Sequence, residues 1–237
     1  MKTIRFLYIS LCLFAATIIM VSCVRGKGDV VSKTFDVESF SGIANNIDAD
    51  IHITQAPIQS VEIVAQQNII KNISLEVTDG ILTIKFKKKA SHYDPININI
   101  SIPKLSSLAI SGSGNMNTIN TFDSCGTVSM DISGSGNIDA YLNSNSNTYT
   151  KISGSGNITL TGNSPDQDIT ITGSGYIHAF TFHTDNSVVK ISGSGTCELK
   201  ADSTLNVTIS GSGDIYYKGH PIITSNITGS GTIHDAN

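Results

Sequence analysis

The sequence predicts an all-β protein built as a parallel β-helix, or β-solenoid, with about 18 to 22 residues in each coil. The first observation behind this prediction is a Gly-Ser-Gly motif that occurs seven times within residues 111–237. A period near twenty residues with a glycine pair in every unit fits neither helical repeats nor propeller blades, and it indicates a solenoid of short strands. The Ser or Thr residues that open the seven copies are Ser111, Ser133, Ser153, Thr172, Ser192, Ser210 and Thr228.

The second observation is the alternation of apolar residues on both sides of each motif. In the second copy Val128, Met130 and Ile132 precede the glycines, and Ile138 and Ala140 follow them, all at positions of one parity. Because successive side chains of a strand point to opposite faces, one face of each coil is predicted to be apolar and to include the glycines. The serines then face outward, and glycine at the bend lets neighbouring coils approach closely.

The amino-terminal residues 1–22 have the pattern of a lipoprotein signal peptide. Two basic residues precede a mainly apolar run over residues 6–21, and the small residue Ser22 precedes Cys23. The run is short for a bilayer span, which needs about 20 residues. We therefore expect cleavage before Cys23, lipidation of that cysteine and a tether over residues 23–33. A plain secretory signal with an incidental cysteine is the alternative.

The segment 34–110 lacks the motif but alternates apolar and polar residues, as in "DIHITQ", "SVEIVAQ" and "GILTIKFK". We interpret it as irregular amino-terminal coils of the same β-helix, followed by seven motif-bearing coils over residues 111–237. A separate small sheet that caps the solenoid is the competing interpretation. We favour the coils, because no Pro- or Gly-rich linker separates the two halves and a solenoid needs a cap at its end. The stretch "QNIIKNI" is expected to form a short helix or turn.

The charged residues and the cysteines exclude several functions. Without residues 1–22 the chain has 13 Lys and Arg against 19 Asp and Glu, a net charge of −6, and no arginine follows Arg25, which argues against nucleic-acid binding. The Cys and His spacing fits no zinc site, and the glycine pairs lack the third glycine and the helix of a dinucleotide loop. We expect no cofactor, no metal ion, no catalytic residue and no disulfide, with Cys125 in a polar turn and Cys197 as a small buried hydrophobe.

One group of outward residues is a candidate binding patch. The positions that follow the glycines stack from coil to coil, and in the later copies they carry aromatic and acidic side chains. One interpretation is an ordinary ladder of polar side chains without a binding role. The functional interpretation is a shallow patch whose aromatic rings stack on a glycan or peptide and whose carboxylates accept its hydrogen bonds. The candidate residues are Tyr176, His178, Glu198, Asp214 and Tyr216.

Several stretches resemble one known family. The repeated "SGSGN" units, "FSGIANNIDADIHITQ", "VTDGILTIKF" and the lipoprotein leader resemble the head GIN domain family of putative auto-transporter adhesins, which is common in Bacteroidota. The resemblance covers nearly the whole chain after the leader. It implies a right-handed β-helix at the cell surface or in the periplasm and implies no catalytic residues.

These observations favour a non-enzymatic lipoprotein, exported and lipid-anchored at the outer membrane or cell surface, that acts as an adhesin or binds a glycan or protein. The alternative is a polysaccharide-degrading enzyme, a glycoside hydrolase or lyase, because such enzymes also use parallel β-helices and Glu198 and Asp214 lie on adjacent coils. The absence of arginine from the repeats argues against a lyase. Since only four residues follow Ile233, we expect the last coil either to be protected only by polar residues such as His234 and Asp235 or to be covered by a partner, which includes self-association through this coil.

Overall fold

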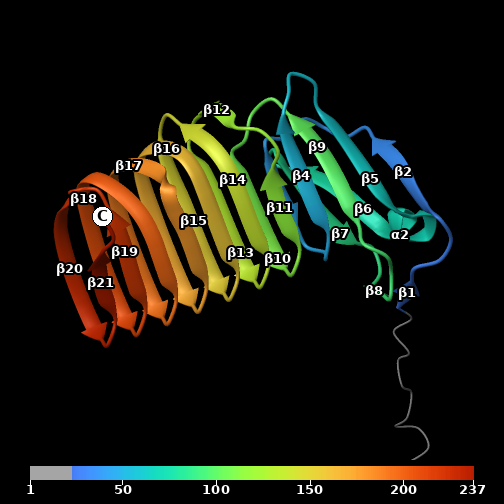
Figure 1. The fold of residues 1–237 in the computed structure, drawn as a ribbon. Coiled ribbons are helices and arrows are strands. Elements are labelled where there is room, and N and C mark those ends of the chain that lie inside the picture. The colour runs from blue at the N-terminus through green and yellow to red at the C-terminus, as the bar shows by residue number, and fades with distance from the viewer. Residues whose placement is uncertain (1–22) are drawn as a thin grey trace, which may run out of the picture.

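The computed structural model describes residues 23–237, so the predicted signal peptide over residues 1–22 lies outside the described residues. The described chain is a β-solenoid in which parallel strands stack coil upon coil (Figure 1), as the sequence predicts. The strands that precede each motif pair in register from one copy to the next. They are β10 (Ser107–Gly112), β13 (Val128–Gly134), β15 (Asn147–Gly154), β20 (Ile222–Gly229) and the second halves of β16 (Asn157–Gly173), β17 (Tyr176–Gly193) and β18 (Thr196–Gly211).

A second set of parallel strands follows the motifs and forms another face of the solenoid. β16, β17 and β18 belong to both sets, because each runs from one motif to the next. The further members are β11 (Asn115–Thr118), β14 (Asn137–Ser144), β19 (Asp214–Lys218) and β21 (Thr232–Asp235), and the short β12 (Phe122–Cys125) pairs with β14. Each motif therefore contributes one coil, as its spacing predicts.

The core is built from the apolar columns that the alternation predicts. The isoleucine that precedes each motif stacks on its counterpart in the next coil, so that Ile132 lies on Ile152 and Ile152 on Ile171. These three side chains are fully buried, whereas the serines of the motifs are exposed apart from the half-buried Ser153. The predicted parity is confirmed. Apolar burial of this kind stabilises by about 25 cal/mol per Å².

Both glycines of a motif are required by close contact between coils. Gly134 has a φ of +146°, and the amide of the next residue, Ser135, donates a hydrogen bond of 2.9 Å to the carbonyl oxygen of Gly112 in the preceding coil. The second glycine, Gly136, is buried, and a Cβ there would lie 2.7 Å from the Cγ2 atom of Ile110. The corner thus needs both backbone freedom and the absence of a side chain.

The segment before residue 107 combines parallel and antiparallel strands. β3 (Gly42–Asn45) and β4 (Asp50–Gln55) pair in parallel with β10 and β11, and with β7 (Ile81–Phe86) and β9 (Asn97–Ile102) on their other side. Antiparallel pairs join β5 (Ser60–Gln66) to β9 and β6 (Ile73–Thr78) to β7. The stretch expected to be a helix or turn is a short helix, α2 (Gln67–Asn72), at this end of the molecule (Figure 1).

The residues expected to form a tether, 23–33, carry two paired strands. β1 (Val24–Arg25) pairs in parallel with β8 (Ala90–Ser91), and β2 (Val30–Phe35) pairs antiparallel with β5. Within residues 23–237, no helix has the length and apolar character to cross a membrane.

The cysteines differ in part from expectation. Cys197 is fully buried, which confirms its prediction as a small hydrophobe. The prediction that Cys125 lies in a polar turn is wrong: it ends β12 with 5% of its surface exposed and packs in the core. Its apolar neighbour Phe122, three residues earlier, is buried too, so the turn-like composition of this stretch is overridden by burial of the strand. Both cysteines and Cys23 are free thiols.

Candidate functional site

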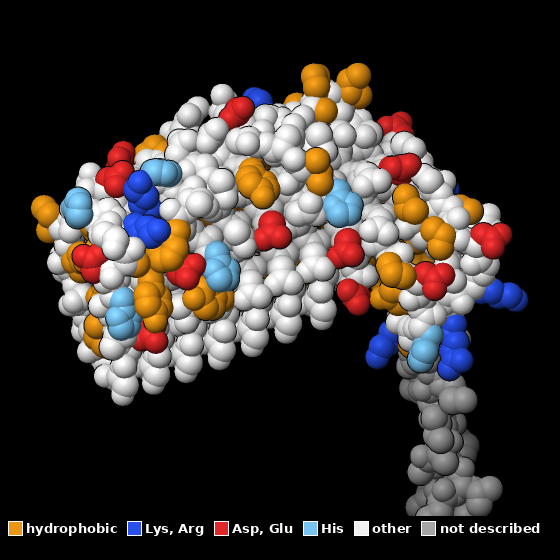
Figure 2. Space-filling view, in the orientation of Figure 1, with side chains coloured by type: hydrophobic (Ala, Val, Ile, Leu, Met, Phe, Trp, Pro, Cys, Tyr) orange, Lys and Arg blue, Asp and Glu red, His pale blue; other side chains and the backbone are white. Residues whose placement is uncertain are grey.

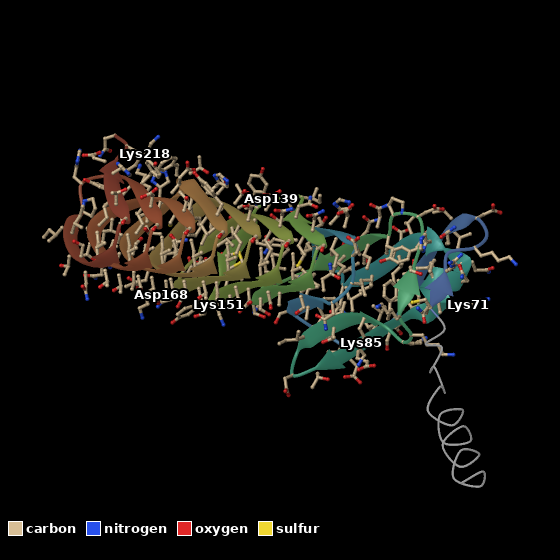
Figure 3. The ribbon with its side chains drawn as sticks, turned by 90° about the horizontal axis from the view of Figure 1, so that it is seen from below. Lys71, Lys85, Asp139, Lys151, Asp168 and Lys218 are labelled. Atoms are coloured by element: carbon tan, nitrogen blue, oxygen red, sulfur yellow. The ribbon has the colours of Figure 1, made fainter. Side chains whose placement is uncertain are left out.

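The candidate site lies on the face formed by the strands that follow the motifs. Figure 3 shows Asp139 and Lys218 on this side of the stack and Lys151 and Asp168 on the opposite side. Two columns of outward residues run along the face, and from Asn115 and Asn117 onward both have the register that the sequence predicts. The first column is Asp50, Asn115, Asn137, Asn157, Tyr176, Thr196, Asp214 and Thr232, and the second is His52, Asn117, Asp139, Thr159, His178, Glu198, Tyr216 and His234.

A ladder of asparagine amides occupies the first column in the early coils. Asn157 Nδ2 donates a hydrogen bond of 2.9 Å to Asn137 Oδ1, and Asn137 Nδ2 donates one of 2.8 Å to Asn115 Oδ1. Asn115 Nδ2 in turn donates to Asp50 Oδ1 over 2.7 Å. An asparagine amide has two N–H donors and two acceptor lone pairs. The ladder uses one donor of each of the three amides and one acceptor site of Asn115 and of Asn137, so each coil presents free donors and acceptors on a fixed side chain.

A shallow groove of about 480 Å³ runs over this ladder. Its walls include Asp139, Thr159 and His178, and Tyr141 stands at its rim with 46% of its surface exposed. A second hollow of about 290 Å³, lined by Asp48, Asp50 and Tyr93, adjoins the first at Asn115. Sequence reasoning missed the groove, because the register places Asp139 in a polar column but does not indicate where the surface is hollowed.

The first part of the predicted patch is a group of three side chains. The rings of Tyr176 and His178 stack with centroids 4.1 Å apart and planes 17° from parallel. Glu198 in the next coil holds both rings: Tyr176 Oη donates to its Oε1 over 3.3 Å, and its Oε2 lies 3.0 Å from His178 Nδ1. Burial, followed by the negative charge of Glu198, raises the pKa of the Tyr176 phenol, so this group remains a hydrogen-bond donor at neutral pH.

The second part of the patch stands two coils further on. The Tyr216 ring stacks on His234, with centroids 4.7 Å apart. Asp214 accepts a hydrogen bond of 3.1 Å from the backbone amide of Thr232 and a shorter one from its hydroxyl. The structure therefore brings Tyr176, His178 and Glu198 into direct contact and places Asp214 and Tyr216 together on β19, in the coil that follows Glu198. His234 is a functional candidate that the predicted set omitted, although the register of the repeats placed it in the same column.

The two acidic residues of the patch form hydrogen bonds to coils on opposite sides. Glu198 bonds to the coil before it, through Tyr176 and His178, whereas Asp214 bonds to the coil after it, through Thr232. Two carboxylates that flank a scissile glycosidic bond would instead face a common space. Within residues 23–237, no group of three or more His, Cys, Asp or Glu side chains could hold a metal ion.

The charge of the face changes along its length. The residues that line the two hollows include three carboxylates, those of Asp48, Asp50 and Asp139, and neither a lysine nor an arginine. Lys200 and Lys218 pair at the later coils, where Lys218 Nζ lies 4.7 Å from the centroid of the Phe180 ring. In Figure 2 the blue lysine and arginine side chains lie toward the ends and the upper edge of the molecule, whereas red acidic side chains are spread over the whole visible face, including its middle.

Comparison with known proteins identifies relatives of most of the chain. A sequence model of the family described as "putative auto-transporter adhesin, head GIN domain" matches residues 39–221. No curated protein matches the chain.

Solved structures from Bacteroidota share the fold. A "putative adhesin" from Parabacteroides distasonis is 28% identical with a TM-score of 0.72, and the match covers 90% of this chain and 99% of that one. A "putative adhesin" from Bacteroides fragilis is 24% identical with a TM-score of 0.80, covering 89% and 99% of the two chains. A "putative lipid binding protein" from P. distasonis is 23% identical with a TM-score of 0.78, covering 91% and 100%. The last two show likeness of fold alone.

Proposed function

The chain belongs to the family of "putative auto-transporter adhesins" with a head GIN domain, and we propose that it is a non-enzymatic adhesin of the cell envelope that binds a glycan. The observation that carries this proposal is the patch of stacked aromatic rings held by Glu198 on the outward face of the solenoid. Aromatic rings that are fixed and partly exposed offer flat apolar surface, and the amides and carboxylates beside them accept or donate hydrogen bonds. Sugars present this combination of an apolar ring face and polar hydroxyls.

A rigid scaffold supports the assignment to binding rather than catalysis. Adjacent coils are joined by parallel strand pairs over most of their length, so the outward side chains are presented in fixed order. Pre-organised side chains lose little conformational entropy on binding. The enzyme alternative is less well supported, because Glu198 and Asp214 bond to coils on opposite sides rather than facing one another.

We further propose that Cys23 carries a lipid and anchors the protein at the outer membrane or cell surface. The supporting observation is the leader pattern that ends at Ser22 and Cys23. Cells that express the full chain with Cys23→Ala should release the protein from the membrane fraction, whereas Cys197→Ala should leave it there. Protease treatment of intact cells then separates surface exposure from a periplasmic location. A Cys23→Ala protein that stays in the membrane fraction would contradict the anchor.

Glycan binding is tested with purified residues 23–237 on a glycan array. For any ligand found, Tyr176→Ala and Tyr216→Ala should each weaken binding about tenfold, which corresponds to about 1.4 kcal/mol. Tyr149→Ala is the matched control, because Tyr149 is 43% exposed and lies on the strand before its motif, on another face. Equal loss in all three variants, or no loss in the patch variants, would place the binding site elsewhere.

A further inference from the structure

We propose that the ligand is an extended glycan chain free of acidic groups, which lies along the solenoid axis in the groove over the asparagine ladder. This inference rests on the proposed function and specifies its ligand class and binding direction. It assigns a role to residues outside the patch, namely Asn115, Asn137, Asp139 and Tyr141.

The direction follows from the stacking of the coils. The first column presents one side chain per coil over eight coils, from Asp50 to Thr232. At a strand spacing of about 4.8 Å, these eight positions span about 34 Å along the axis. The groove runs from Asn115 to His178 of the patch, and the second hollow adjoins it at Asn115. A linear ligand that repeats at a similar distance can therefore meet an equivalent group on each coil.

The chemistry of the groove suits the hydroxyls of sugar rings. Asn115, Asn137 and Asn157 are held at 2.7 to 2.9 Å in one hydrogen-bonded chain, and each keeps an N–H free for a ligand. A fixed amide that still has donor and acceptor capacity can pair with a hydroxyl, which is both donor and acceptor, without a large loss of side-chain entropy. Tyr141 at the rim and the Tyr176–His178 stack at the end add aromatic surface.

The charge of the groove defines which glycans it accepts. Asp48, Asp50 and Asp139 contribute negative charge, and none of the residues that line the two hollows is a lysine or an arginine. Carboxylate- or sulfate-bearing sugars would meet like charge without a compensating cation, whereas amine-bearing sugars would meet opposite charge. Lys200 and Lys218 lie beyond the groove, and Lys218 already lies over the Phe180 ring. The groove therefore selects neutral or amine-bearing chains.

The test compares linear oligosaccharides of matched lengths that differ in charge. Neutral oligomers of glucose and N-acetylglucosamine, amine-bearing oligomers of glucosamine and acidic oligomers of galacturonic acid are measured against residues 23–237 by calorimetry. We expect affinity for at least one neutral or amine-bearing series to rise with each added sugar up to about six units, and we expect no measurable binding of the acidic series. Equal or tighter binding of the acidic series, or an affinity that does not depend on length, would overturn the proposal.

Two variants test whether the dependence of affinity on glycan length and charge arises in the groove. Asn137→Ala removes one amide of the ladder and should weaken hexamers about tenfold while leaving dimers bound at the patch unchanged. Asp139→Asn keeps the shape of an exposed side chain and should weaken the amine-bearing hexamer more than a neutral hexamer, because it removes the charge. Tyr149→Ala again serves as the control, and circular dichroism checks that each variant is folded.

The outcomes separate this inference from the proposed function. If short glycans bind and Tyr176→Ala weakens them but Asn137→Ala changes no ligand of any length, the axial groove is refuted and the glycan-binding patch stands. If none of these series binds and the glycan array shows no ligand, the proposed function fails as well.

Discussion

Gly154 lies directly on Gly134 of the preceding coil, and the amide of Ser155 donates a hydrogen bond of 2.9 Å to the Gly134 carbonyl oxygen. Gly154 has a φ of +141°, and a Cβ there would press against the Gly134 carbonyl, closer than real contacts permit. Gly154→Val should therefore lower the free energy of unfolding by at least about 2 kcal/mol, through overpacking and backbone strain. Urea denaturation of the purified protein measures the change.

Gly126 provides the control for that experiment. A Cβ at Gly126 would have no atom within 4 Å, and its φ is not positive. Gly126→Ala should leave the unfolding midpoint nearly unchanged or raise it slightly, because alanine restricts the unfolded chain. Similar midpoints for both variants would show that the close approach of coils at Gly154 does not limit stability.

The ion pair between Asp131 and Lys151 provides a test of the register between adjacent coils. The two residues are paired in the parallel ladder, as their sequence positions predict, and Lys151 Nζ lies 3.7 Å from Asp131 Oδ2. Both side chains are about half exposed, so the coupling measured in a double-mutant cycle with alanine should not exceed about 1 kcal/mol. The coupling should shrink in 1 M NaCl, because salt screens exposed charges. A coupling of several kcal/mol, or one that salt does not change, would contradict a surface pair.

The repeats make this part of the fold predictable in detail. A motif that returns every 18 to 22 residues fixes both the coil length and the register, so the stacking of Ile132, Ile152 and Ile171 follows from their positions in the repeats. Residues 34–110 contain no repeated motif that would set the coil length and the register. Antiparallel partners such as Val31 and Ala65 lie far apart in sequence, and no spacing predicts their pairing.

Replacing either of two buried side-chain amides with an apolar side chain is expected to change the stability of the protein, in opposite directions at the two positions. Gln167 lies inside the coils with 1% of its surface exposed, and neither its Oε1 nor its Nε2 has a hydrogen-bond partner among the described residues. Asn72 is also buried, but its Nδ2 donates to the Lys88 carbonyl over 2.7 Å and its Oδ1 accepts from the Lys88 amide over 3.1 Å. An unsatisfied buried polar group costs about 1 to 3 kcal/mol, whereas a satisfied one stabilises.

Gln167→Met should therefore raise the thermal unfolding midpoint, and Asn72→Leu should lower it. Differential scanning calorimetry of the two variants and the parent protein measures the direction of both midpoint shifts in one series. A lower midpoint for Gln167→Met would mean that its amide is satisfied in solution.

Cys125 and Cys197 should resist alkylation in the folded protein. Burial raises the pKa of both thiols, and the charge of Asp123 adds to the effect at Cys125 and that of Glu198 at Cys197. Because the thiolate is the nucleophile, a raised pKa lowers its fraction at pH 8. Iodoacetamide at pH 8 should modify the partly exposed Cys23 of unlipidated protein rapidly and the other two only after urea is added. Rapid labelling of Cys197 in native protein would show that the later coils open.

The candidate site is predictable from the sequence only as columns of residues. The repeats place Tyr176, His178 and Glu198 near one another, because register fixes which positions stack. Side-chain direction is not set by register. The bonds that turn Glu198 toward one coil and Asp214 toward the other, and the hollow beside Tyr141, depend on rotamers and local twist that no spacing specifies.

The last described coil leads to a prediction about association. All residues of β20 are exposed, and within residues 23–237 this strand pairs only with β18. Ile223 and Ile227 continue the inward columns of Leu205 and Ile209, yet they are 37% and 39% exposed. Unpaired strand edges with apolar residues favour pairing with another chain.

We expect purified residues 23–237 to self-associate through this edge as the concentration rises. Ile227→Lys places a charge in the exposed inward column and should shift the protein toward the monomer in light scattering over a concentration series. Thr224→Lys is the matched control, because Thr224 lies on the same strand at the opposite parity and carries the same new charge without altering the apolar column. Equal effects of the two variants would attribute the shift to net charge. A parent protein that stays monomeric at millimolar concentration would show that the polar residues around the edge suffice to protect it.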